Sequence, residues 1–331
     1  MSMPAEWHPQ SAIYLAWPCS EKLWPNSRPH IFAEFAKLVE TIAPHTAVKI
    51  LCEKSHQDQA LAHLSTRDNI TLIDIKTDDV WIRDYGPIFT YSQSDQTQLL
   101  SWQFNAWGGK FADFVNDNAV AQQIADHSSL QLTKSKFNFE GGAIDTNGAG
   151  LGITTKSVIH NINRNPAEQQ ADVTQAIKTH YGLDELIILD DGLINDDTDG
   201  HIDNITRFFK ERGILTCTCD ATNPNYTQLQ ANLKELEKFR TPNGEGLEIL
   251  ELPLPDPIFH EGEILPASYT NFLISNKAVF IPSFDQKEND LRAQNIIQNC
   301  FPNKKIIPID CRIFILEGGA IHCLSQQEIS P

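Results

Sequence analysis

The sequence predicts an α/β fold made of repeated helix-to-strand units, and three observations support this prediction. Amphipathic helical patterns alternate five times with apolar, β-rich runs along the 331 residues. Glycine and proline residues stand where several of these helices should end. The pentapeptide EGGAI occurs twice, at Glu140–Ile144 and Glu317–Ile321, each time after the strand of its unit. Five units could form a doubly wound sheet or a ring. The repeated pentapeptide favours a ring, because a ring brings corresponding loops together near one axis.

The individual elements follow from hydrophobic periodicity and from the residues that stop helices. Pro44, Gly182 and Pro302 follow the first, third and fifth predicted helices. The helix-to-strand pairs are His30–Ala43 with Ala47–Cys52, Asp113–His127 with Leu130–Phe139, Ala167–Tyr181 with Leu186–Leu189, Pro224–Phe239 with Leu247–Leu252, and Glu288–Cys300 with Lys305–Ile309. Extra strands are predicted at Leu99–Phe104, Gly213–Cys219 and Ala278–Pro282. No long Pro/Gly/Ser-rich linker divides the chain, so residues 1–331 are expected to form a single domain.

Composition and charge exclude several classes of protein. The formal net charge is −17, which disfavours nucleic acid or an anionic membrane as a partner because phosphate binding needs a basic face. The same charge favours encounter with a small cation, although it also serves solubility alone. No apolar run approaches the roughly 20 residues of a membrane span. The N-terminus lacks the pattern of a secretory signal, so a cytoplasmic location is expected.

Cysteine usage indicates neither a zinc ribbon nor a disulfide framework. The seven cysteines are odd in number, irregularly spaced and without a C-x-x-C pair. Most should be reduced core or surface residues, and one or more could be reactive.

Clusters of polar residues follow the predicted strands of four units. If the units form a ring, these clusters meet at one end of its axis, where binding loops on a rigid scaffold belong. The clusters are DDVWIRDYGP (residues 78–87), EGG (140–142), DDGLINDDTDGHID (190–203) and EGGAIHC (317–323).

The first cluster allows two interpretations. The Gly-Pro turn predicts that Asp84 and Tyr85 sit at the end of a strand, where Asp84 would be free for binding. The alternative is structural: an Asp–Arg ion pair under the turn, with Trp81 in the core.

The acidic run around His201 is the least ordinary part of the chain. In a strand, residues two apart point to the same face, so His201 and Asp203 would project together. This arrangement suits a general base beside a carboxylate that binds substrate, and it also suits a metal site.

Cys323 follows the second EGGAI. A cysteine in this position is commonly a buried structural residue. If His201 lies nearby, however, its imidazolium would stabilise the nucleophilic thiolate.

A guanidinium substrate explains why one site would hold a cysteine, a histidine and several carboxylates. Guanidinium is a planar cation that presents N–H donors in a fork, and carboxylates hold it in bidentate pairs. Its carbon can be attacked by a thiolate, and the departing amine needs a general acid. Asp84, Glu140, His201, Asp203 and Cys323 supply these roles.

Long stretches of the chain resemble the agmatine deiminase and bacterial-type peptidyl-arginine deiminase family, and together they span nearly its whole length. They are MPAEWHPQSAIYLAWP, DDVWIRDYGP, FNAWGGKF, FNFEGGAIDTNGAG, TDGHIDNITRF, LPASYTNFL and GGAIHCLSQQEIS. The resemblance implies a pentein fold, which is a five-bladed α/β propeller of ββαβ-type repeats. It also implies that the whole chain is one catalytic domain that needs neither a metal nor a cofactor.

The resemblance also assigns roles by position. Cys323 is similar to the family nucleophile, and His201 resembles the acid/base. Asp84 and Asp203 resemble the carboxylates that grip the guanidinium, and Glu140 resembles the carboxylate that supports the same site. Two tryptophans are expected to help bind the substrate, one as an apolar wall and one to close the pocket; they are Trp81 and Trp107.

The activity implied is agmatine iminohydrolase, which forms N-carbamoylputrescine and ammonia in polyamine metabolism. Three alternatives share the same residues: a peptidyl-arginine deiminase, a deiminase of another guanidino compound, and an amidinotransferase. A non-catalytic binding propeller is disfavoured because Cys323 and His201 are both present. A metallohydrolase is disfavoured because the chain has no HExxH or HxxxH spacing. The expected partner is a small cationic guanidino substrate, and a homo-oligomer is left open.

Overall fold

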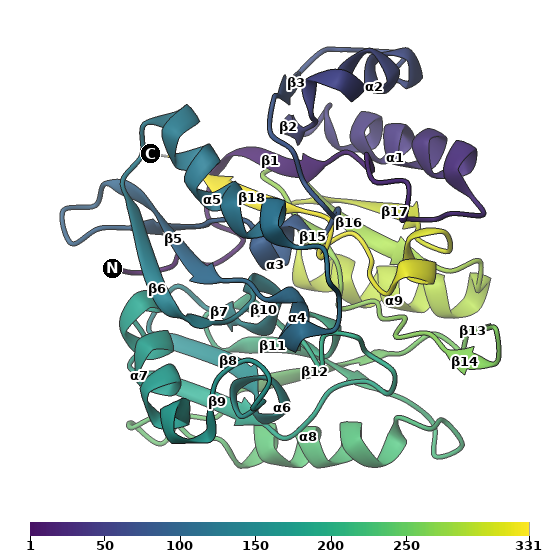
Figure 1. Ribbon diagram of the computed structural model, residues 1–331. Coiled ribbons are helices and arrows are strands. Elements are labelled where there is room, and N and C mark those ends of the chain that lie inside the picture. Colours follow the sequence, from purple (N-terminus) through teal and green to yellow (C-terminus); the bar gives the residue numbers. More distant parts are fainter. Residues whose placement is uncertain (331) are drawn as a thin grey trace.

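The computed structural model describes residues 1–330, and five of its sheets share one design (Figure 1). In each, one strand pairs antiparallel with a second strand. The second strand then pairs parallel with a third, which it reaches through a helix. Each sheet thus contains one strand–helix–strand segment. In chain order these segments are β1 (Gln10–Ala16), α1 (Arg28–Ile42) and β2 (Ala47–Leu51); β5 (Thr97–Gln103), α5 (Val115–Ser128) and β6 (Leu132–Asn138); β8 (Leu151–Thr155), α7 (Gln170–Tyr181) and β9 (Glu185–Leu189); β11 (Gly213–Thr218), α8 (Tyr226–Lys238) and β12 (Glu248–Pro253); and β16 (Ala278–Ser283), α9 (Lys287–Cys300) and β17 (Lys305–Asp310).

The antiparallel partner in each sheet comes from a neighbouring part of the chain, with one exception. The partners are β18 (Gln326–Ile329) for β1, β4 (Ile88–Tyr91) for β5, β7 (Asp145–Thr146) for β8, β10 (Thr206–Lys210) for β11, and β15 (Leu273–Ile274) for β16. The exception is β18, which joins the last strand of the chain to the first, with Ile13 opposite Gln327. This pairing places the segment that carries Cys323 beside the N-terminal sheet.

The remaining elements are short. β3 (Ile70–Ile73) extends the first sheet beside β2, and β13 (Phe259–His260) forms a hairpin with β14 (Glu263–Ile264). The other helices and helical turns are α2 (Gln57–His63), α3 (Ile82–Tyr85), α4 (Ala106–Gly109), α6 (Lys156–Ile159), η1 (Lys54–His56), η2 (Gly141–Ala143), η3 (Ala167–Gln169), η4 (Ile202–Asn204) and η5 (Phe314–Glu317).

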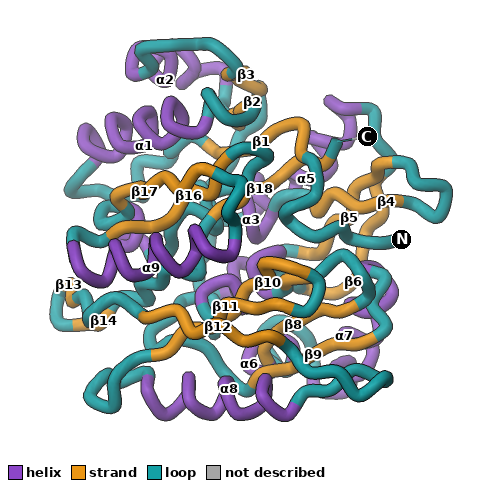
Figure 2. Tube along the Cα trace, turned by 180° about the vertical axis from the view of Figure 1, so that it is seen from behind, coloured by secondary structure: helices purple, strands orange, loops and turns teal. Residues whose placement is uncertain are grey.

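The helices pack outside the strands and bury one apolar face each. Figure 2 shows α1, α8 and α9 along the outer side, with strands running between and behind them. In α1, for example, Ile31, Phe35 and Val39 are fully buried at helical spacing, so this face supplies core while the other side meets water. Within residues 1–330, no helix has both the length and the apolar character needed to cross a bilayer.

The five predicted helix-to-strand pairs are all present, with shifted ends. α1 begins at Arg28 rather than His30, because Pro29 is compatible with the first turn of a helix. The third predicted helix starts as the 3₁₀ turn η3 and becomes α-helical only from Gln170.

Two local predictions were wrong. Asp84 and Tyr85 do not end a strand; they lie in the helical turn α3, which follows β3 rather than β2. His201 and Asp203 do not alternate along a strand either. His201 precedes the 3₁₀ turn η4, and Asp203 lies within it. In both places the sequence is too short and too polar for periodicity to distinguish a helical turn from a strand.

Candidate active site

Five predicted site residues from four separate loops converge on one buried point. Asp84 lies in α3, and Glu140 is the residue just before η2. His201 is the residue just before η4, Asp203 lies within η4, and Cys323 lies in the loop before β18. The two ring nitrogens of His201 lie 3.5 Å from Asp84 Oδ1 and 3.5 Å from Glu140 Oε2. The Cys323 sulfur lies 3.5 Å from Asp203 Oδ2. All five side chains are buried.

The first EGG segment permits this convergence because Gly142 has no side chain. A Cβ at Gly142 would lie 2.6 Å from His201 Nδ1 and 2.7 Å from Asp84 Oδ1. The backbone N–H of Gly142 instead donates a hydrogen bond to Asp84 Oδ1 over 3.1 Å. The glycine therefore lets the main chain itself become part of the site.

A cavity of about 240 Å³ leads to this point, with Asp84 and Cys323 among its lining residues. Trp81 and Trp107, both expected in the substrate pocket, line it together with Phe111. Trp107 also donates from Nε1 to Asp84 Oδ2 over 3.0 Å, which fixes that carboxylate. Gly319 allows the chain to pass against Trp81, whose ring would lie 2.5 Å from a Cβ there.

The histidine and one carboxylate carry opposite charges near neutral pH. Burial alone would lower the pKa of His201, but the carboxylates of Asp84 and Glu140 raise it to about 9. Burial raises the pKa of Asp84 to about 6, against the opposing effect of His201. Between these values His201 is an imidazolium and Asp84 is an anion.

The cysteine is a thiol in the unliganded protein. Burial, followed by the negative charges of Asp203 and Asp84, raises the pKa of Cys323 well above its usual range. Asn271 opposes this shift by donating from Nδ2 to the sulfur over 3.0 Å. The sequence left open whether Cys323 is a thiolate before substrate binds; burial and the two carboxylates favour the thiol in this state.

Several polar atoms at the point of convergence lack partners. Among the described residues, neither ring nitrogen of His201 nor Asp203 Oδ1 has a hydrogen-bond partner, although all three atoms are buried. Buried polar groups are normally paired. An acceptor at Asp203 Oδ1, beside the Cys323 sulfur, is suited to an N–H donor from a ligand.

Sequence reasoning missed the residues that hold the carboxylates in place. Arg164 binds Glu140 with Nε at 2.8 and 3.0 Å from its two oxygens, and together with His201 it lowers the pKa of Glu140 despite burial. His322 Nδ1 lies 2.7 Å from Asp203 Oδ2, and His322 Nε2 lies 2.9 Å from Glu6 Oε2. His322 is next to Cys323 and Glu6 lies in MPAEW, so both were inside motifs already singled out.

The structural alternative for DDVWIRDYGP was right about Trp81, which is buried in the main hydrophobic core, but wrong about the ion pair. Arg83 does not pair with its neighbour Asp84. It donates from Nε to the His322 carbonyl over 3.3 Å and from Nη1 to Gln327 Oε1 over 2.7 Å. The Asp84 carboxylate therefore interacts with His201, Gly142 and Trp107 instead.

The acidic run before His201 has its own internal order. Asp196 accepts hydrogen bonds from Thr198 and Asn204, and Asp199 pairs with Arg164 over 2.6 Å and with Lys110 over 2.6 Å. Within residues 1–330, no three His, Cys, Asp or Glu side chains are grouped as a metal ion would require.

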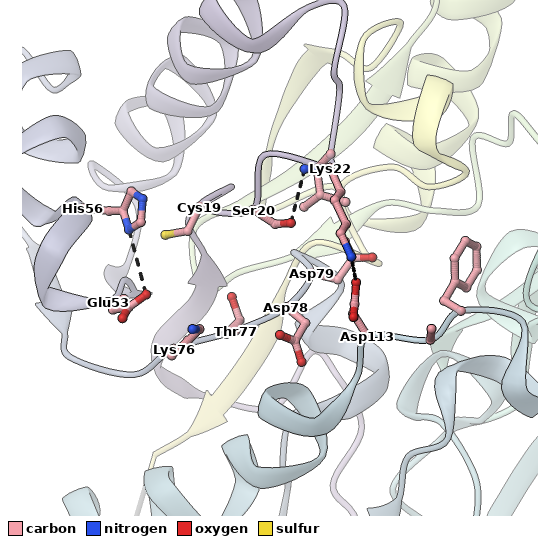
Figure 3. Close-up of a pocket in the computed structure, with 13 residues that line it drawn as sticks. Cys19, Ser20, Lys22, Glu53, His56, Lys76, Thr77, Asp78, Asp79 and Asp113 are labelled. Atoms are coloured by element: carbon pink, nitrogen blue, oxygen red, sulfur yellow. Dashed lines mark hydrogen bonds and ion pairs between the residues drawn. The ribbon is translucent and has the colours of Figure 1, made fainter.

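A second cavity of about 400 Å³ adjoins the first and shares Lys22, Leu23, Asp79 and Phe111 with it. Figure 3 shows Lys22 reaching across this second cavity to pair with Asp113. Its lining mixes acidic and basic groups, and none of the five converging residues belongs to it.

Known proteins resemble this chain over nearly its whole length. The Porphyromonas-type peptidyl-arginine deiminase family matches residues 2–328. The agmatine deiminase of Ectopseudomonas mendocina is 34% identical, and the match covers 99% of this chain and 95% of that protein.

Solved structures show the same similarity. An agmatine deiminase of Enterococcus faecalis superposes with a TM-score of 0.92 at 26% identity, covering 99% of this chain and 95% of that one. A cysteine-to-serine variant of the C. jejuni agmatine deiminase, with substrate bound, gives 0.89 at 32% identity, covering 99% and 96%.

A more distant structure shares the fold alone. An amidinotransferase from Microseira wollei gives a TM-score of 0.55 at 10% identity, covering 98% of this chain and 96% of that one. The mixed α/β fold is therefore that of pentein-type deiminases and amidinotransferases. With the family match over nearly all residues, the chain belongs to the Porphyromonas-type peptidyl-arginine deiminase family, and with it to the hydrolases that cleave a guanidino carbon–nitrogen bond.

Proposed function

We propose that this protein is an agmatine iminohydrolase that uses Cys323 as a covalent nucleophile. The observation that carries the proposal is the placement of the Cys323 sulfur 3.5 Å from Asp203, at a pocket lined by Cys323 and by Asp84, whose carboxylate lies 3.5 Å from the His201 ring. Agmatine is the proposed substrate because the relatives from Ectopseudomonas mendocina, Enterococcus faecalis and C. jejuni are agmatine deiminases and align over nearly the whole chain.

The guanidinium is held by carboxylates before any bond changes. Asp84 and Asp203 accept its N–H donors, and Asp203 Oδ1 is a buried acceptor with no other described partner. Glu140, fixed by Arg164, keeps His201 protonated and in place. Trp81 forms an apolar wall, and Trp107 orients Asp84 and closes the pocket.

Binding of the cation also prepares the nucleophile. The negative charges of Asp203 and Asp84 help raise the pKa of Cys323, so a guanidinium between them cancels part of that effect. The thiol then gives its proton to solvent water more readily, and the thiolate attacks the guanidinium carbon.

The reaction proceeds in two balanced steps. The sulfur–carbon bond forms, and a carbon–nitrogen bond breaks as the His201 imidazolium gives its proton to the departing ammonia. Neutral His201 then takes a proton from water. The hydroxide adds to the carbon of the S-alkylthiouronium, and collapse expels the Cys323 sulfur, which takes up the proton of the new hydroxyl group and becomes a thiol again. Ammonia takes up the proton that the thiol first released, so the sum is agmatine plus water giving N-carbamoylputrescine plus ammonium.

The proposal includes the finer architecture expected from the sequence. The five sheets, each with an antiparallel strand and a parallel strand–helix–strand segment, support a five-bladed α/β propeller that forms a single catalytic domain. We further propose that the enzyme works in the cytoplasm, without a metal or cofactor.

The test is ammonia release from agmatine by the purified protein, with free arginine and an arginine-containing peptide as alternative substrates. We expect the largest kcat/KM for agmatine. Turnover of either arginine substrate at an equal or greater kcat/KM would mean that the protein is a deiminase of a different guanidino compound. A new guanidino product in the presence of a second amine would indicate an amidinotransferase.

A further inference from the structure

The short helix α4 winds in the left-handed sense, which is rare for a chain of L-residues. The φ angles of its four residues, in chain order, are 53°, 54°, 87° and 79°. The Gly109 N–H donates to the Asn105 carbonyl over 2.7 Å, and the Lys110 N–H donates to the Ala106 carbonyl over 3.0 Å. Residues with a Cβ rarely adopt this conformation, and then singly, because the Cβ comes too close to the following carbonyl oxygen. The two non-glycine residues, Ala106 and Trp107, are therefore held at a cost in free energy, which points to a functional reason.

The side chain of Trp107 extends from this turn toward the reacting groups. Its Nε1 donates to Asp84 Oδ2 over 3.0 Å. The indole ring meets the rings of Phe104 and Phe111 edge to face, with centroid distances of 5.1 and 5.5 Å. A turn of the opposite hand would point the Cα–Cβ bond of Trp107 in another direction, so the hydrogen bond to Asp84 depends on the hand of α4.

Asn105 holds the turn closed from the position just before it. Its Oδ1 accepts a hydrogen bond from the Gly108 N–H over 2.9 Å, which caps the turn. Its Nδ2 donates to the Asn163 carbonyl over 3.0 Å. Both ends of the amide are thus used, and the second one tethers α4 to the residue before Arg164, whose guanidinium binds Glu140.

Lys110 ties the other end of the turn to the same network. It directly follows α4 and pairs with Asp199 over 2.6 Å. Asp199 also pairs with Arg164 over 2.6 Å. The turn is therefore fixed on one side by the segment that holds Glu140 and on the other side by Asp84. These contacts offset the cost of the left-handed conformation.

We propose that α4 is a positioning element of the active site, in which Asn105 keeps the turn left-handed so that Trp107 fixes the Asp84 carboxylate for the guanidinium. Asn105 acts through Trp107 and is a positioning residue rather than a catalytic one. The inference rests on the proposed deiminase activity and assigns a role to a segment that the chemistry above uses only through Trp107.

The hydrogen bond from Trp107 is one of several influences on the charge of Asp84. Burial raises the pKa of Asp84 to about 6, and His201 lowers this pKa. Asp203 and Glu140 raise it, and the Trp107 N–H lowers it. A looser α4 leaves the other groups in place and weakens only the bond from Trp107, so Asp84 should keep its proton to higher pH. Further titratable groups within electrostatic reach of Asp84 are Asp79, Tyr85 and Cys323.

Gly109→Ala and Gly244→Ala form a matched pair that separates this role from ordinary backbone strain. Both glycines are exposed, with φ of 79° and 81°, and a Cβ on either would meet nothing within 4 Å. Each substitution adds the strain of a left-handed alanine without a clash, so both should lower the thermal midpoint by similar amounts. Only Gly109→Ala loosens α4, because Gly244 lies in the loop between α8 and β12.

The readout is kcat/KM for agmatine in each variant, relative to the natural chain, at about pH 5 and at about pH 8. We expect the loss in Gly109→Ala to be about two- to tenfold larger at the lower pH than at the higher, because a rise of up to about one unit in the pKa of Asp84 acts only on the acid limb. Gly244→Ala should show the same ratio to the natural chain at both pH values. An equal loss at both pH values in Gly109→Ala would mean a merely structural role and would overturn the inference.

Asn105→Ala tests the same role without adding a strained residue. It removes both the cap on Gly108 and the tether to Asn163, so it should give the same pH-dependent loss. The control is Asn223→Ala, which removes another half-buried side chain that accepts from a backbone N–H, that of Asn225, over 3.0 Å. Asn223 lies just before α8, and its variant should behave as the natural chain at both pH values. A loss in Asn105→Ala that is independent of pH would contradict the proposed role.

Nuclear magnetic resonance of the indole N–H groups decides the inference without turnover and so separates it from the proposed function. The chain has six tryptophans, and Trp107→Phe identifies the signal of Trp107. In the natural chain this signal should shift with pH, with a midpoint near about 6 as Asp84 ionises. The midpoint should rise in Gly109→Ala and stay unchanged in Gly244→Ala, and this result supports the inference even if agmatine is not turned over. A signal that does not shift with pH, or one midpoint shared by all three proteins, would overturn the inference even in an active deiminase.

Discussion

Two groups of buried charges meet at Asp203, and they differ in how fully their hydrogen bonds are satisfied. Behind Asp203, Glu6 pairs with Arg207 and His322, and Arg207 also holds Asp145 over 3.1 Å. In front of it lies a second group, Asp84, His201 and Cys323, and there both nitrogens of His201 and Asp203 Oδ1 have no hydrogen-bond partner in residues 1–330.

The difference separates support from function. Charges buried with all their partners present hold a structure in one geometry, because removing any one of them leaves the others buried without a partner. Buried polar atoms without a hydrogen bond cost stability in the free protein and are retained where a ligand completes them. The rear group, Glu6, Arg207, Asp145 and His322, therefore positions Asp203, while Asp203 Oδ1 keeps an acceptor free for a ligand.

The largest effect should come from the front group. Cys323→Ala should lower kcat for agmatine on the order of 10⁴-fold or more, as for other covalent nucleophiles. Its thermal midpoint should change little, because the thiol takes part in only two weak hydrogen bonds, one donated by Asn271 and one donated to Asp203. Ammonia release and thermal unfolding measure the two quantities. Retention of a substantial fraction of the natural activity would remove Cys323 from the mechanism.

The rear group should show its effect in stability. Arg207→Met leaves Glu6 and Asp145 buried without their cation, so the free energy of unfolding should fall by about 3–5 kcal/mol. The control is Arg312→Met, which breaks exposed ion pairs with Asp310 and Asp285 and should cost no more than about 1 kcal/mol. Denaturant unfolding compares them. Equal losses in the two variants would erase the distinction between the buried network and an ordinary surface pair.

The front group should also set the pH dependence. Asp84 binds the guanidinium only as an anion, so kcat/KM should fall as pH drops through about 6, the value to which burial raises the pKa of Asp84. His201 donates only as an imidazolium, so kcat/KM should fall again as pH rises through about 9. Below the lower pKa and above the higher one, kcat/KM should decrease by nearly tenfold per pH unit. A flat profile across both values would contradict these roles.

The sequence predicted those parts of the fold and the site whose residue patterns are long, and it failed where the patterns are short. The five helix-to-strand pairs repeat over many residues, so periodicity located them. The turns that carry Asp84 and Asp203 are only a few residues long, and their conformation is decided by packing between distant loops. Motifs nevertheless identified these side chains correctly as neighbours. The contacts of Asn271 and Arg164, and the thiol state of Cys323, depend on burial that no local pattern contains.

The smallest effect should come from Trp107, whose contact with the front group is one hydrogen bond to Asp84. That bond lowers the pKa of Asp84. Trp107→Phe keeps the aromatic wall and removes the donor, so the acid limb of kcat/KM should move to higher pH by less than about one unit. A shift to lower pH would mean that the indole N–H does not stabilise the carboxylate.

Mass spectrometry of the enzyme quenched during turnover of agmatine tests the covalent role of Cys323 most directly. We expect a fraction of the protein to gain the mass of agmatine less ammonia, with the added group mapped to the peptide that contains Cys323. Under the same conditions Cys323→Ala should gain nothing. Full turnover with an unmodified Cys323 peptide, or the same adduct on the Cys323→Ala protein, would contradict a covalent mechanism at this residue.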